Sequence, residues 1–291
     1  MKLGVFAAMA SPYADAEVIA ALGRVAEERG VHSIWVPEHV VLFEEYASSY
    51  PYSPDGKIPA PPGSGMLEPF TLLSYLAAVT TTVRLGTAIC LLPQRNPVYT
   101  AKEAAAVDYL SNGRFDFGIG VGWLEEEFAA VNVDWPRRGK RTDDYVAVMK
   151  ALWCDDPSSF HGEFYDLPAC NMHPKPVQSP HPPLHFGGES DAALRRVARV
   201  GQGWHTFNRL PDQLAEPLAT LDRFLADEGR TRSDIELTVS PYFNPLTPEM
   251  VGQYAEAGVD QVTSLLFATS VADVEQGFDD LQACIDAAAA T

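Results

Sequence analysis

The residues best suited to chemistry are Glu38 and His39, near the end of the segment SIWVPEHV at Ser33–Val40. A histidine can exchange a proton near neutral pH and can donate a hydrogen bond to an oxygen that gains negative charge. A histidine after a strand can equally be a structural hydrogen-bonding group, and the sequence leaves both roles open. We expect His39 to face a site, because the carboxyl ends of parallel strands commonly carry reacting groups.

Two glycine-rich segments could approach a ligand closely. The segment GIGVG is not the G-x-G-x-x-G pattern of a dinucleotide site, but Gly120 and Gly122 would let the backbone approach a flat ring. Small residues inside a tight strand explain the same pattern. In HFGGES, Gly187 and Gly188 precede Ser190, a good helix N-cap, so this helix start could bind an anion or simply be capped.

The sequence contains neither a metal-site pattern nor the motif of a covalent nucleophile. The histidines of the segment Asp155–Pro183 are irregularly spaced and lack neighbouring carboxylates in ligand geometry. There is no G-x-S-x-G motif and no Cys/His pair. The cysteines are widely scattered, at Cys90, Cys154, Cys170 and Cys284. We therefore expect the chemistry to come from an organic cofactor.

The composition describes an acidic chain that can bury a large core. The chain has 291 residues, 46% of them hydrophobic, and a formal net charge of −18. Such a charge repels nucleic acids and anionic membrane surfaces. No apolar run is long enough for a membrane helix, so we expect a cytoplasmic protein. Two clusters of cations are available to an anionic cofactor: Arg195, Arg196 and Arg199, and Arg137, Arg138, Lys140 and Arg141.

The elements that must position these residues follow a repeating pattern. Short β-branched or aromatic runs alternate with helical patterns from end to end, which is typical of parallel β/α units. The pattern predicts one (β/α)8 TIM barrel, α/β in class, with residues 1–291 as a single domain, although a doubly wound open sheet would look similar locally. The eight predicted strands are Lys2–Ala7, Ser33–Val36, Val83–Leu91, Phe115–Val121, Leu184–Phe186, Gly203–Thr206, Ile235–Ser240 and Gln261–Leu266.

Two long segments do not fit the repeat. Val40–Leu67 is rich in Pro, Gly, Ser and Tyr, and Asp155–Pro183 contains seven prolines. Loops of this length in a compact domain are commonly lids or binding loops. We therefore expect both to be insertion loops at the C-terminal face of the barrel, lining the substrate mouth.

Several segments together resemble the luciferase-like monooxygenase superfamily, and within it an actinobacterial branch of F420-dependent oxidoreductases. LPQRNP followed by LSNGR and GVGW is the most specific combination. The similarity extends over about the whole chain. The segments that carry it are Val83–Phe128, Ser159–Pro168, Lys175–Ser190 and Gly201–Phe207.

This resemblance implies a flavin-type ring at the top of the barrel. It implies a non-prolyl cis peptide between Ala88 and Ile89 that lies against the ring. It also implies that Glu38 and His39 contact the ring edge. The phosphate of the cofactor would bind at Gly187, Gly188 and Ser190.

The proton donor is the position where this chain departs from the family pattern. Several deazaflavin enzymes of the superfamily place a glutamate just after the glycine-rich turn, whereas here Trp123 follows Gly122. His39 is our first candidate for the catalytic proton donor and Glu126 is the second, although Glu126 could instead brace a helix.

The function implied by the resemblance is hydride transfer between F420 and a small organic substrate. An FMN-dependent monooxygenase on the same fold is the near alternative, and a non-catalytic flavin-binding barrel is another. A deazaflavin carries hydride without forming the usual oxygen adduct, so the identity of the cofactor decides the class of reaction. The resemblance also leaves a homodimer open.

Overall fold

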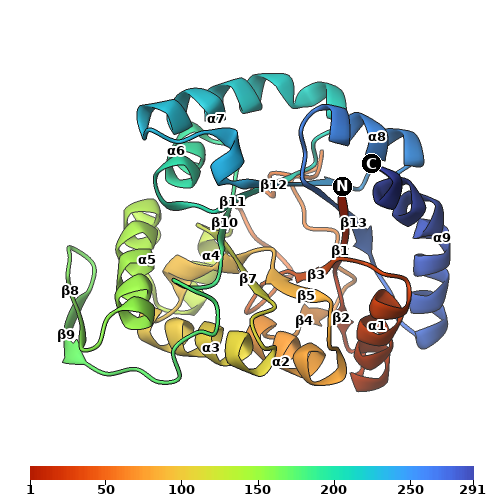
Figure 1. Ribbon diagram of the computed structural model, residues 1–291. Coiled ribbons are helices and arrows are strands. Elements are labelled where there is room, and N and C mark those ends of the chain that lie inside the picture. Colours follow the sequence, from red (N-terminus) through yellow and green to blue (C-terminus); the bar gives the residue numbers. More distant parts are fainter.

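A closed barrel of parallel strands forms the centre of the protein, as shown by the computed structural model, which describes residues 1–291 (Figure 1). Its strands are β1 (Lys2–Ala7), β3 (Ser33–Val36), β5 (Arg84–Thr87), β7 (Phe115–Gly120), β10 (Leu184–Gly187), β11 (Gly203–Phe207), β12 (Glu236–Tyr242) and β13 (Gln261–Leu266). They pair in the order β10-β11-β12-β13-β1-β3-β5-β7, and pairing of β7 with β10 closes the ring. The predicted (β/α)8 barrel is confirmed, and an open sheet is excluded.

Helices surround this barrel in the ring seen in Figure 1. They are α1 (Ala16–Glu28), α2 (Pro69–Val79), α3 (Pro97–Leu110), α4 (Glu125–Ala130), α5 (Arg138–Cys154), α6 (Asp191–Val200), α7 (Ala215–Asp227), α8 (Pro248–Glu256) and α9 (Val271–Ala290). Short 3-10 turns lie at Leu92–Gln94, Pro211–Gln213 and Arg232–Asp234. No helix combines the length and the apolar character needed to cross a membrane.

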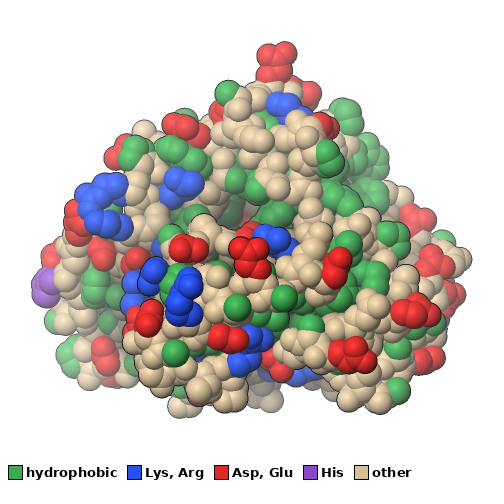
Figure 2. All heavy atoms as spheres, turned by 90° about the horizontal axis from the view of Figure 1, so that it is seen from above, with side chains coloured by type: hydrophobic (Ala, Val, Ile, Leu, Met, Phe, Trp, Pro, Cys, Tyr) green, Lys and Arg blue, Asp and Glu red, His purple; other side chains and the backbone are tan.

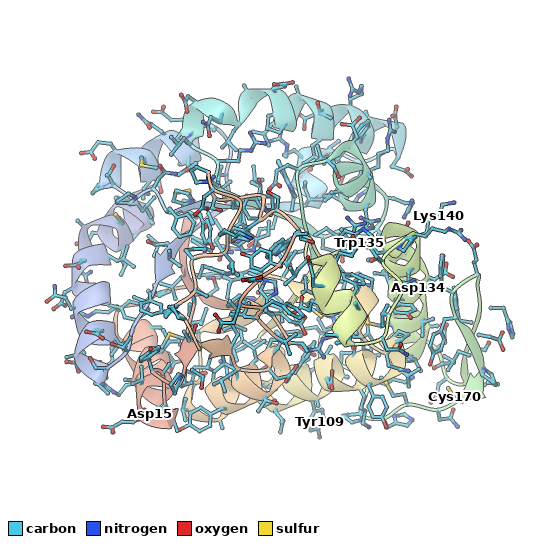
Figure 3. The ribbon with its side chains drawn as sticks, turned by 180° about the vertical axis from the view of Figure 1, so that it is seen from behind. Asp15, Tyr109, Asp134, Trp135, Lys140 and Cys170 are labelled. Atoms are coloured by element: carbon cyan, nitrogen blue, oxygen red, sulfur yellow. The ribbon has the colours of Figure 1, made fainter.

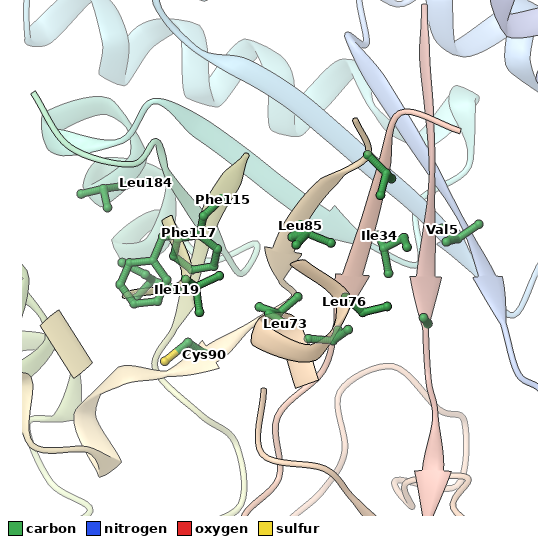
Figure 4. Packing of buried hydrophobic residues seen from close by; sticks show 14 of the residues in the cluster. Val5, Ile34, Leu73, Leu76, Leu85, Cys90, Phe115, Phe117, Ile119 and Leu184 are labelled. Carbon is green, nitrogen blue, oxygen red and sulfur yellow. The ribbon is translucent and has the colours of Figure 1, made fainter. Parts of the chain in front are cut away.

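The alternation of side chains along β3 shows how the strands divide the core. Ile34 and Val36 belong to a cluster of 63 buried residues, which also contains Leu73 and Leu76 of α2 (Figure 4). Trp35 belongs to a separate cluster. Its ring lies edge-on to the rings of two buried histidines of β10 and β11. Successive strand residues point to opposite faces, so β3 packs against helices on one side and fills the barrel on the other.

The first long segment, residues 40–67, crosses the mouth of the barrel as predicted. In Figure 3 its chain runs across the middle of the ring of helices. A short antiparallel pair, β2 (Ala10–Ser11) with β4 (Gly65–Met66), holds its end. A hydrogen bond of 2.7 Å between the hydroxyls of Tyr50 and Tyr242 ties its middle to the end of β12.

The second long segment, Asp155–Pro183, does not reach the mouth, and this part of the prediction was wrong. It forms a hairpin of β8 (Ser158–His161) and β9 (Asp166–Cys170), which lies outside α5 in Figure 1. The physical reason is the direction of the chain. A segment between a helix and the next strand starts at the amino-terminal end of the barrel, whereas the active face is built from strand-to-helix loops.

Candidate active site

A cavity of about 390 Å³ opens at the carboxyl ends of the strands, beneath residues 40–67. Ligand pockets in proteins commonly measure roughly 300–1,000 Å³ and are mostly apolar with a few polar groups. Here 17 of the 30 lining residues are hydrophobic, which fits that description. The aromatic lining residues are Phe6, Tyr50, Tyr52, Trp123, Phe207, Tyr242 and Phe267.

The fold brings nearly all the residues predicted from the sequence to this cavity. Its walls include Glu38, His39, Ala88, Ile89, Gly122, Gly187, Gly188 and Ser190, which come from four different strand ends. Gly120 and Glu126 are the exceptions: Gly120 lies buried in β7, and neither residue lines the cavity. The expected cis peptide between Ala88 and Ile89 is confirmed.

The glycines of β7 make room for protein groups rather than for a ligand. A Cβ on Gly120 would lie 1.8 Å from Cδ1 of Ile89, and one on Gly118 would lie 1.8 Å from the carbonyl oxygen of Thr87. Gly122 differs, because it lines the cavity with a φ of +79° that favours glycine. We predicted that the backbone of this segment approaches a ligand closely. At Gly120 the group that approaches the backbone is the side chain of Ile89, so of these glycines only Gly122 is available to a ligand.

Glu38 is held in a network that supports the cavity wall. Its carboxylate accepts hydrogen bonds from the Leu91 amide (2.6 Å) and from Nε of Arg95 (2.7 Å). Arg95 in turn pairs with Glu68 and Glu103. Both oxygens of Glu38 are thus engaged, and its buried charge is balanced by Arg95. Glu38 therefore has a structural role in the cavity wall rather than a role in proton transfer.

His39 is oriented by Glu127, a residue that sequence reasoning did not select. Glu127 is fully buried, and its carboxylate accepts from Nδ1 of His39 (3.1 Å), the Val40 amide (2.7 Å) and Nε2 of Gln94 (3.0 Å). A carboxylate only accepts, so Nδ1 carries the hydrogen. No protein group is hydrogen-bonded to Nε2 of His39, and the ring lines the cavity beside Trp123. This nitrogen is free to exchange a proton with a ligand.

The spacing of residues in α4 contains the signal that could have identified Glu127. Leu124, Glu127 and Phe128 are all buried, whereas Glu125 is exposed. Positions i, i+3 and i+4 share one face of a helix, so the apolar residues at 124 and 128 mark position 127 as inward-facing. A glutamate on a buried helical face must find donors, and here it finds His39.

Glu126, the second predicted proton donor, does not line the cavity. Its Oε1 accepts hydrogen bonds from the amides of Ala47 (2.6 Å) and Ser48 (3.2 Å). A hydrogen bond from the Ser48 side chain, followed by these backbone donors, lowers the pKa of Glu126 to about 2. Glu126 therefore fits the bracing role, because its ionised carboxylate holds residues 40–67 to α4, and it does not fit the role of proton donor.

The start of α6 offers hydrogen-bond donors at the rim of the cavity. Ser190 caps the helix by accepting from the Ala193 amide (3.3 Å), while the amides of Asp191 and Ala192 have no protein acceptor. Free amides at a helix start bind anions well. Arg138 donates to the carbonyl of Gly122, a cavity residue (3.2 Å), and forms no ion pair with a carboxylate.

The other predicted cations form ion pairs, lie at the surface or, in the case of the buried Arg141, donate to the carbonyl of Asp134 (2.6 Å). Arg196 and Arg199 both pair with Asp143, at 2.7 and 2.9 Å, and Arg137 pairs with Glu163. Figure 3 labels Trp135 and Lys140 near the start of α5, where the guanidinium of Arg138 stacks on Trp135 at 3.6 Å. Arg138 is thus the member of the two clusters that contacts a cavity residue, Gly122, and that has no carboxylate partner of its own.

Comparison with known proteins shows which family this chain is similar to. The family model of luciferase-like monooxygenases matches residues 1–263. An uncharacterized protein of Mycobacterium tuberculosis (strain ATCC 25618 / H37Rv) is 35% identical over 241 residues, covering 83% of this chain and 82% of that protein. The FMNH(2)-dependent dimethylsulfone monooxygenase of Pseudomonas putida is 33% identical over 142 residues, 48% of this chain and 39% of that enzyme.

A solved structure shows the same fold over the whole length. The F420-dependent secondary alcohol dehydrogenase in complex with an F420-acetone adduct has a TM-score of 0.77 and 17% identity, and the match covers 99% of this chain and 98% of that one. The match of the family model, the identity to the mycobacterial protein and the shared fold agree. The chain therefore belongs to the luciferase-like monooxygenase family, as an enzyme of the kind that uses a flavin or deazaflavin cofactor.

Proposed function

We propose that this protein transfers hydride between the deazaflavin F420 and a small organic substrate, and that His39 moves the accompanying proton. The observation that carries the proposal is the pair formed by His39 and Glu127. Hydride transfer to a carbonyl carbon requires a proton at the carbonyl oxygen, and oxidation of an alcohol requires the reverse. His39 is the cavity residue whose titratable nitrogen is both exposed to a ligand and free of protein partners.

The residues at the cavity fit a phosphorylated tricyclic cofactor. Ala88, Ile89 and Gly122 would lie against the ring, with little side chain to prevent close approach at Gly122. Gly188, Ser190 and the free amides of α6 would bind the phosphate. When bound, F420 supplies the carbon that accepts or donates the hydride.

Glu127 acts on the reaction through His39. By accepting from Nδ1 it keeps the proton of the neutral ring on that nitrogen and directs Nε2 to the ligand. Trp123 packs edge-on against the ring at 5.7 Å and limits its rotation. The rotamer of His39 is therefore set before a substrate arrives.

An FMN-dependent monooxygenase is the second candidate, favoured by the identity to the FMNH(2)-dependent enzyme of Pseudomonas putida. The same cavity and the same helix start would hold FMN. The two candidates differ in the chemical step after binding, because reduced FMN reacts with O2. The His39–Glu127 pair favours F420, since proton exchange with the substrate itself is required there.

The experiment is an equilibrium titration of purified apoprotein with F420 and, separately, with FMN and reduced FMN. We expect F420 to bind at least about tenfold more tightly, a free-energy difference of about 1.4 kcal/mol. Tighter binding of either form of FMN would favour the monooxygenase. Turnover of ketones and enones with reduced F420 then separates an enzyme from a barrel that binds the cofactor without catalysis.

A further inference from the structure

A second carboxylate of the cavity, that of Glu189, has no positively charged partner. Its oxygens accept from Oγ1 of Thr206 (2.9 Å), the Phe207 amide (3.2 Å) and the hydroxyl of Tyr52 (3.2 Å). All three donors are neutral, and no Lys, Arg or His forms an ion pair with Glu189. Glu38, by contrast, has Arg95.

No lysine or arginine of the cavity lining compensates this charge, and Arg209, which lies near the Tyr52 hydroxyl, does not line the cavity. The lining residues include no lysine and no arginine, and His39 is turned toward Glu127 through Nδ1. The chain as a whole carries a net charge of −18, and Figure 2 shows acidic side chains spread over the face in view. The carboxylate of Glu189, which is bound to Thr206 and Phe207 of β11, therefore adds a negative charge there that attracts a cationic group.

Aromatic rings line the cavity next to the groups that donate to this carboxylate. Tyr52, which donates to Glu189, lies 5.8 Å from Phe207 and 6.2 Å from Tyr242, measured between ring centroids. Phe207 and Tyr242 are 5.7 Å apart, and all three rings line the cavity. Aromatic faces attract cations, and a carboxylate next to several such faces is the arrangement that recognises alkylammonium groups.

We infer that the substrate is an apolar molecule that carries a cationic amine, and that its ammonium group binds between Glu189 and the rings of Tyr52, Phe207 and Tyr242. This inference rests on the proposed function, because it names the substrate class of the same cavity. A carboxylate has about four acceptor positions and three are in use, so a further contact is open without loss of existing bonds. The ammonium group contributes to binding only, whereas His39 exchanges the proton at the reacting oxygen of the substrate.

The probe is benzyltrimethylammonium, compared with neopentylbenzene, which has the same shape without the charge. Both are titrated into the purified protein by calorimetry, with and without F420. The wild-type protein is expected to bind the cation at least about tenfold more tightly, since cation–π contacts and a partly buried carboxylate each contribute about fivefold. Equal affinity, or tighter binding of the neutral compound, overturns the inference.

Two variants assign the preference to the carboxylate. Glu189→Gln keeps the shape and removes the charge, so the ratio of the two affinities should fall about fivefold, to the part that the aromatic rings provide. Tyr52→Phe removes a donor to Glu189 but keeps the charge, so the ratio should stay above about five. An unchanged ratio in Glu189→Gln contradicts the inference. If that variant does not fold, Glu189→Asp, which withdraws the carboxylate by one methylene, is expected to lower the ratio instead.

This test is independent of the cofactor assignment. It measures binding without turnover, so it can succeed even if FMN binds more tightly than F420. The reverse also holds, because F420 binding and reduction can be observed while the two probes bind equally. Failure of the substrate inference and failure of the proposed function thus give different results.

Discussion

Replacement of Glu127 by glutamine should slow hydride transfer while leaving cofactor binding nearly unchanged. The amide has the same size as the carboxylate, but it removes the charged acceptor that lies 3.1 Å from Nδ1 of His39. A hydrogen bond to a charged group contributes roughly 1.5–3 kcal/mol. If that energy orients His39 in the transition state, its loss corresponds to a rate about 10- to 150-fold lower.

The assay is the single-turnover rate of cofactor reduction, measured beside the dissociation constant of the cofactor. Glu126→Gln is the matched comparison, because it makes the same chemical change one residue earlier, at a carboxylate that accepts from the Ala47 and Ser48 amides. We expect a much smaller effect on the rate from Glu126→Gln. His39→Ala should lower the rate by about 100- to 10,000-fold, as expected for loss of general acid catalysis.

A double-mutant cycle separates an effect through His39 from a general loss of structure. If Glu127 acts only through His39, Glu127→Gln should not lower the rate further in a His39→Ala background. Independent, additive losses would mean that Glu127 supports the fold rather than the imidazole. A Glu127→Gln enzyme with wild-type rate beside an inactive Glu126→Gln enzyme would refute the assignment and make Glu126 the acid.

Three further predictions concern stability and the cofactor site. Burial lowers the pKa of His205 to about 3, from 6.5, so the unfolded chain binds a proton there between these pH values and the folded chain does not. Stability should therefore fall by about 1.4 kcal/mol per pH unit below pH 6.5, and His205→Gln should show a weaker dependence in urea unfolding at pH 7 and pH 5. Gly120→Ala should reduce stability by about 1–3 kcal/mol in the same assay, because its Cβ would lie 1.8 Å from Cδ1 of Ile89; an unchanged urea midpoint would show that Ile89 repacks freely. Gly188→Asp should bind the cofactor at least about tenfold more weakly than Gly188→Asn, which shares the strain of the φ of +102° but lacks the charge, and equal affinities would place the phosphate elsewhere.

The barrel could be predicted because its strands are local features of the sequence. Each of the eight predicted runs coincides with a barrel strand, with ends that differ by a few residues. The run Val83–Leu91 is the most altered, since it divides into β5 and the short β6 (Cys90–Leu91) on either side of the cis peptide. The segment Asp155–Pro183 was misplaced even though its position after a helix already indicates the amino-terminal end of the barrel.

The site was only partly predictable because it depends on contacts between distant residues. His39 could be proposed from its place after a strand, but its partner Glu127 is 88 positions away. Likewise, the absence of a Cβ at Gly120 is visible in the sequence, whereas the neighbour that requires it, Ile89, is known only from the packing. The inward-facing position of Glu127, in contrast, could have been predicted from the apolar residues Leu124 and Phe128 on the same helical face.

The most direct test of the proposed function is an anaerobic single-turnover reaction with a substrate deuterated at the carbon that would lose hydride. The protein is mixed with oxidised F420 and the substrate, and both the loss of deazaflavin absorbance and the deuterium in the cofactor are measured. We predict stoichiometric reduction without O2, transfer of one deuterium to F420, and a slower reaction in His39→Ala. No reduction of F420 under these conditions, together with O2 consumption and oxygenated product when reduced FMN is supplied, would contradict the proposed function.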